Sequence, residues 1–289
     1  METPISHIDL TLPSGWQELD DEQLLYFFAL MAEDFDSDTI KTLCLCRWSG
    51  LQVRHRHNYD FVCRHKGREF IVKAVQIAEL LPALSWLDTI PSFPVCISQI
   101  GRHRALSPDF SEVSFEKFIV CDNLYQGYLT TQRDDLLVQL ASILYQSPIP
   151  ISLSPAERIS AFYWFASVKD LFARQYPHFF QTASQPDNLL GGNRLPTGAQ
   201  IQQAVNTMIR ALTKGDMTKE REILSLDTHR ALTELDTQAR EYKEINDKIK
   251  GTVLLVCGRM GCFIYLASGN QKNRPFAIKT RLIDKFSES

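Results

Sequence analysis

Near residue 183 the chain changes character, and this change limits how its 289 residues can fold. Before it lies an aromatic-rich pattern typical of a globular core. After it come a stretch rich in Pro, Gly, Asn and Ser, then a highly charged helical pattern, then a short apolar run. We therefore predict a main domain over 1–182, a linker over 183–197, a helical hairpin over 198–250 and an apolar, then basic, C-terminal segment over 251–289.

Local signals in the main domain predict an α+β fold that is predominantly α-helical, with a small N-terminal sheet. Asp20 and Asp36 are good N-cap residues ahead of two amphipathic helices. Lys66-Gly67 lies between two short β-patterned runs, where the glycine supplies the positive φ of a tight turn. A hairpin over 54–73 is therefore expected beside the helices.

The clearest helix signal is Ser154-Pro155-Ala156-Glu157, with Ser as N-cap, Pro at the first helical position and Glu closing a capping box. Large side chains follow at helical spacing. A stripe of this kind is typical of a buried core rather than of a ligand site. The predicted core residues of this helix are Ile159, Phe162, Phe165, Val168, Phe172 and Tyr176.

The charged segment predicts two helices, one from Ala199 to Leu212 and a longer one from Ser225 to Lys250, ended by Gly251. Apolar residues recur at heptad spacing in the long helix. It therefore either folds back on the first helix or forms a short coiled coil, and its modest length favours the hairpin. We expect the partner, another protein or a second copy, to bind Leu235, Tyr242, Ile245 and Ile249, unless the main domain covers them.

The net charge of −3 gives no overall attraction to nucleic acid or to an anionic membrane. The charge is unevenly distributed, however: Lys and Arg gather in the hairpin over 54–73, whereas 15–38 carries acids and neither Lys nor Arg. Nucleic-acid binding is therefore an alternative function. The residues that would contact phosphates are Arg54, Arg56, Arg64, Lys66 and Arg68.

Residue patterns for catalysis or for cofactors are weak. The potential metal ligands Cys44, Cys46, His55, His57, Cys63 and His65 do not have zinc-site spacing, so we expect no metal and no cofactor. No motif for a nucleophile elbow, a zinc protease or a phosphate loop occurs. An enzyme whose site is assembled from distant residues remains a second alternative, because such a site leaves no local signature.

The N-terminal sequence does not resemble a signal peptide, and the most apolar run, Val253 to Ala267, is interrupted by Arg259 and is too short to span a bilayer. The seven cysteines follow no disulfide framework. These features predict a cytoplasmic protein that does not insert into a membrane.

Three segments resemble tail-module proteins of tailed phages and prophages of gut bacteria, including tail assembly chaperones. They are the opening Leu12-Pro13-Ser14-Gly15-Trp16-Gln17-Glu18-Leu19, the stretch from Phe115-Glu116-Lys117-Phe118 to Leu144-Tyr145, and Met208-Ile209-Arg210-Ala211-Leu212. The chain departs from such chaperones in its length, its basic hairpin and its apolar C-terminal run. The resemblance implies a mainly helical, non-enzymatic assembly factor in the cytoplasm of a bacterial host.

Overall fold

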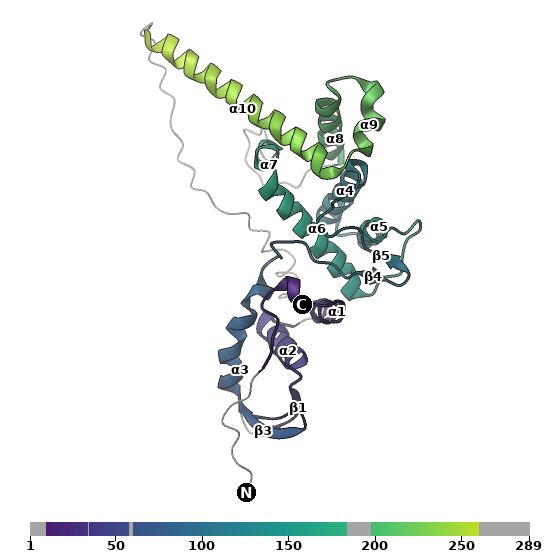
Figure 1. The fold of residues 1–289 in the computed structure, drawn as a ribbon, viewed down its shortest axis with the longest axis vertical. Helices are drawn as coiled ribbons and strands as arrows, with labels where there is room; N and C mark the ends of the chain where they lie inside the picture. The colour runs from purple at the N-terminus through teal and green to yellow at the C-terminus, as the bar shows by residue number, and fades with distance from the viewer. Residues whose placement is uncertain (1–9, 34, 58–59, 184–197, 260–289) are drawn as a thin grey trace. The chain divides into compact units, whose positions relative to one another are not determined.

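The computed structural model describes residues 10–33, 35–57, 60–183 and 198–259. Ten α-helices and a small three-stranded antiparallel sheet make up most of the described chain, which confirms the predicted α+β, predominantly helical class (Figure 1). The chain divides into two compact units. The first unit contains 1–175 and 188–231, and the second contains 176–187 and 232–289.

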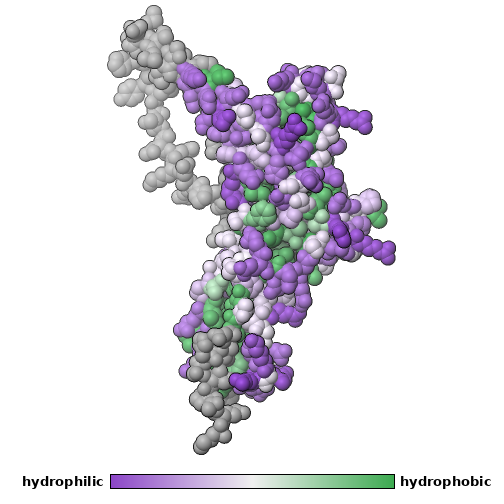
Figure 2. All heavy atoms as spheres, viewed as in Figure 1, coloured by the Kyte–Doolittle hydropathy of each residue, from purple (hydrophilic) through white to green (hydrophobic). Residues whose placement is uncertain are grey.

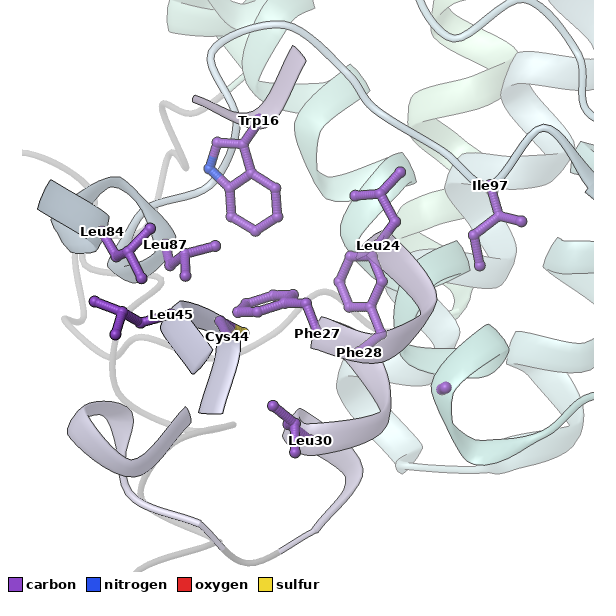
Figure 3. Close-up of a cluster of buried hydrophobic side chains, with 11 residues drawn as sticks. Trp16, Leu24, Phe27, Phe28, Leu30, Cys44, Leu45, Leu84, Leu87 and Ile97 are labelled. Atoms are coloured by element: carbon purple, nitrogen blue, oxygen red, sulfur yellow. The ribbon is translucent and has the colours of Figure 1, made fainter. Parts of the chain in front are cut away.

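The first hydrophobic core is built by two capped helices and a 3-10 helix. Helix α1 (Asp21–Ala32) begins at Asp20, whose carboxylate accepts the Gln23 N–H at 2.8 Å, while the Gln23 side chain accepts the Asp20 N–H. Helix α2 (Ser37–Ser49) begins at Asp36, whose carboxylate accepts the Thr39 N–H at 2.9 Å, and packs against the 3-10 helix η2 (Leu81–Asp88). Both predicted caps are confirmed. Side chains from these elements gather around Trp16, Phe27, Phe28, Leu45 and Leu84 (Figure 3).

The predicted hairpin is confirmed, and a third strand joins it. Strand β2 (Asp60–His65) pairs with β3 (Arg68–Lys73) around Gly67, which has φ +82°. Strand β1 (Gln52–His57) pairs with the other side of β2, with an irregularity between Val53 and His55. The short helix α3 (Ala74–Leu80) follows β3 directly.

A second core is dominated by aromatic rings. It lies among α4 (Phe115–Thr131), α5 (Asp134–Leu144) and α6 (Pro155–Gln175), and α6 also packs along α1. The predicted Ser154 capping box is present, since the Ser154 N–H donates to the Glu157 carboxylate at 2.7 Å. The predicted stripe is buried at Phe162, Phe165, Val168, Phe172 and Tyr176. Its rings pack edge-on and stacked against Phe110, Phe118 and Tyr125.

The C-terminal helices differ from the expected pair. Helix α8 (Gly198–Thr213) packs against α4 and against an additional short helix, α9 (Glu220–Ser225), within the first unit. The long helix α10 (Thr228–Arg259) passes through Gly251, so the prediction that Gly251 ends this helix is wrong. One glycine costs a helix only about 1 kcal/mol, and no proline lies between Gly251 and Arg259 to stop it.

The remaining elements are short. Among the described residues, no helix combines the length and the apolar character needed to cross a membrane. The predicted linker falls on 184–197, which lies outside the described residues, as do residues 260–289 of the C-terminal segment. The short elements are η1 (Trp16–Glu18), β4 (Gln99–Ile100), β5 (His103–Arg104), α7 (Pro177–Ala183) and η3 (Met217–Lys219).

Candidate protein-binding surface

Helix α10 begins at a dense set of hydrogen bonds within the first unit. The Asp227 carboxylate accepts the N–H groups of Glu112 at 2.9 Å and of Arg230 at 3.2 Å, and so serves as an N-cap that also holds a neighbouring loop. Both the N–H and the hydroxyl of Thr228 donate to the Val113 carbonyl, at 2.8 and 2.7 Å. The start of α10 is therefore fixed by hydrogen bonds that join Asp227 and Thr228 to the backbone of Glu112 and Val113, and not by side-chain packing alone.

The loop that receives α10 has an unusual backbone. Phe110 and Glu112 adopt φ values of +64° and +62°, a left-handed conformation that non-glycine residues rarely take. Contacts with the rest of the unit offset its strain: Phe110 is fully buried among aromatic rings, and the Glu112 N–H donates to Asp227, while within the loop the Asp109 carboxylate accepts hydrogen bonds from Ser107 and Ser111. These hydrogen bonds lower the pKa of Asp109, although its partial burial acts in the opposite direction and is the largest single influence.

Exposure rises along α10. Ala231 and Leu232 are fully buried, and Leu235 is 5% exposed. One heptad later, Tyr242 is 64% exposed and Ile245 is 56% exposed. Leu235 is thus not accessible to a partner, which corrects its assignment as an anchor, whereas Tyr242 and Ile245 are accessible.

Charged side chains flank the two exposed apolar residues. Glu241 and Lys248 are both exposed and fall on the same side of the Tyr242–Ile245 stripe at helical spacing. We call these four residues, Glu241, Tyr242, Ile245 and Lys248, the α10 surface. The side chain of Ile249, the remaining predicted anchor, lies outside the described residues.

Within the second unit, α10 also holds the start of α7. The Asp236 carboxylate accepts the Phe179 N–H at 2.9 Å, one of the N–H groups at the beginning of α7 that has no carbonyl partner in its own helix. Asp236 precedes the α10 surface by more than one turn and lies outside it. The charged residues of α10 thus include one that has a clear structural role.

The basic residues of the sheet do not share one face. The cross-strand register places Arg64 opposite Glu69, and Arg54 lies 4.0 Å from the same Glu69 carboxylate. Arg56 is opposite Phe61 and Arg68 is opposite His65, which puts this second pair on the other face. Lys66 is in the turn. Four of the five predicted phosphate contacts are therefore divided between two faces, and one of these faces includes the acid Glu69.

The thiols offer no nucleophile at neutral pH in the described part of the chain. Burial raises the pKa of Cys44 and of Cys96 to about 12 and that of Cys46 to about 11. It also raises the pKa of Cys63 and Cys121. Because the thiolate is the reactive form, these five side chains remain inert. The described residues also contain no group of three or more His, Cys, Asp or Glu placed to hold a metal ion.

A shallow groove on the first unit was not predicted from the sequence. It has a volume of about 490 Å³ and lies between α4, α5 and the loop after α5, with Lys117, Val120, Ile143 and Gln146 in its lining. Its residues come from segments that meet only in the folded chain, so no local pattern marks it. Apolar side chains are otherwise dispersed among hydrophilic ones over the visible surface (Figure 2).

Comparison with known proteins identified no relative. No protein-family model, no curated protein and no solved structure matches this chain.

Proposed function

We propose that this chain is a non-enzymatic protein-binding factor that docks its partner on the α10 surface. The observation that carries the proposal is the exposure of Tyr242 and Ile245, one turn apart, on a helix whose earlier apolar positions are buried. An aromatic residue beside an aliphatic one is typical of an interface centre.

The energetics favour burial of these two side chains by a partner. Removing a Tyr or Ile side chain from water contributes about 1.5–3 kcal/mol when it is fully covered. The hydrogen bonds of Asp227 and Thr228 fix the first turn of α10 before any partner arrives. A surface on a preformed helix loses little conformational entropy on binding, which increases the affinity available from a small contact.

The setting that we propose is the assembly of a tail module in a tailed phage or prophage. It is supported by the resemblance of the segments within 12–145 and 208–212, and a predominantly helical fold is compatible with it. In this setting the chain would act in the cytoplasm of a bacterial host, with another tail protein or a second copy of itself bound to the α10 surface during assembly.

Site-specific photo-cross-linking tests the proposed surface. A photo-reactive amino acid replaces Tyr242 in one variant and Met217 in a control, because Met217 is also an apolar residue with high exposure, 80%, but lies on η3. We expect a discrete adduct from position 242, identified by mass spectrometry, and none from position 217. Equal adducts at both positions, or none at position 242, would contradict the proposal.

A further inference from the structure

We infer that the partner on the α10 surface is a second copy of this chain, with two α10 helices packed antiparallel about a twofold axis between Lys243 and Glu244. This inference rests on the proposed function, because it uses the same surface. It adds the identity of the partner and the direction in which the partner's helix runs.

The exposed apolar residues match each other about this axis. Tyr242 and Ile245 occupy neighbouring core positions, a and d, of a heptad pattern. An antiparallel pair brings position a of one helix against position d of the other. With the axis between Lys243 and Glu244, Tyr242 of each copy lies opposite Ile245 of the other, and both exposed side chains become buried.

Charge complementarity selects the antiparallel direction. Glu241 and Lys248 occupy successive g positions, which face each other in antiparallel coiled coils. About this axis, Glu241 of one copy is displaced along the helix by only two residues, about 3 Å, from Lys248 of the other. The twofold symmetry therefore creates two identical ion pairs, one on each side of the Tyr242–Ile245 layers.

A parallel pair in register lacks this match. In parallel coiled coils a g position faces the e position five residues later in the partner helix, which places Glu241 against Asn246. The other charged residues of this stretch occupy the outer positions b, c and f, away from the apolar stripe in either arrangement; they are Arg240, Lys243, Glu244 and Asp247. Only the antiparallel pair gives Glu241 an oppositely charged neighbour.

The contact is short, so the association should be weak and reversible. Leu235 is already buried within its own chain, which leaves the overlap to residues from about Gln238 to Lys248. This stretch is about 15 Å of helix, and stable coiled coils need about three to four heptads. We therefore expect a monomer–dimer equilibrium that shifts with protein concentration and with salt.

Charge reversal in the full-length chain tests both the partner and the direction. Glu241→Lys and Lys248→Glu each turn two attractive pairs into two repulsive ones, so each should weaken dimerisation about tenfold at low salt, measured by sedimentation velocity. An equimolar mixture of these two variants should form heterodimers with wild-type affinity. The double variant Glu241→Lys/Lys248→Glu should form homodimers with the same affinity. Glu244→Lys makes the same charge change as Glu241→Lys away from the apolar stripe, and should leave dimerisation unchanged.

Three results would overturn the self-pairing. They are a wild-type chain that stays monomeric at all concentrations, equal weakening of dimerisation by Glu241→Lys and Glu244→Lys, and a mixture of the two charge-reversed variants that does not regain dimerisation. Failure here is distinguishable from failure of the proposed function. A monomeric chain that still cross-links a different protein through position 242 retains the surface and loses only the self-pairing.

Discussion

At the scale of single residues, three side chains fix where helices of the first unit begin, and two backbone conformations shape the loop that receives α10. Asp20, Asp36 and Ser154 all cap helices as expected, because each side chain accepts the backbone N–H of the residue three positions later. The left-handed conformations of Phe110 and Glu112 could not be predicted, because their strain is compensated by residues distant in the sequence.

The buried thiols predict a loss of stability in alkali. Burial raises the pKa of Cys44 and Cys96 from an ordinary value of 9.0 to about 12 in the folded chain. The unfolded chain therefore releases these protons first, so their stabilising contribution is complete below about pH 9 and is lost as the pH rises toward 12. We expect the free energy of unfolding, measured by urea denaturation, to fall across this range.

The control for this prediction is the Cys44→Ala/Cys96→Ala variant. It has a lower stability at neutral pH because two buried side chains are truncated. Its loss of stability with rising pH should nevertheless be shallower than in the wild-type chain. Identical slopes for the two proteins would show that these thiols do not control the alkaline transition.

At the scale of elements, the spacing of apolar residues predicted which segments form helices better than it predicted which other elements those helices pack against. The apolar stripe predicted on α6 is confirmed, because one face of this long helix is buried along most of its length. Strand β1 was missed as a third strand because its sequence is polar except for Val53 and its side chains from Gln52 to Arg56 are all exposed, without the alternation of a half-buried strand. The α10 surface was predicted in part: Tyr242 and Ile245 are exposed, whereas the heptad pattern could not show that Leu235 is covered.

The anchoring of α10 is testable at Asp227. Asp227→Ala removes the acceptor for the N–H groups of Glu112 and Arg230, so we expect it to lower the free energy of unfolding by about 1–2 kcal/mol. Asp227→Asn keeps one of the two carboxylate oxygens, so it can still accept one of these N–H groups and should lose less stability than Asp227→Ala. Hydrogen exchange should quicken at both Glu112 and Arg230 in the Ala variant but at only one of them in the Asn variant; unchanged exchange at both amides of the Ala variant would contradict the proposed anchor.

At the scale of the whole molecule, the chain forms two compact units. The structure groups α8 and α9 with the N-terminal helices, while most of α10 belongs with α7 in the second unit. The sequence pattern had instead paired 198–212 with the long helix. An amphipathic helix shows which of its faces is apolar, but not which neighbour covers that face. The pairing of α8 with α10 therefore stays a prediction.

The most direct test of the central claim is the dissociation constant of the double variant Tyr242→Ala/Ile245→Ala for the partner that position 242 cross-links. Both side chains are largely exposed, so we expect the melting temperature to stay within about 2 °C of the wild-type value while affinity falls at least about tenfold. Unchanged affinity, or a melting temperature lowered by more than about 5 °C, would show that these residues serve the fold and not a partner.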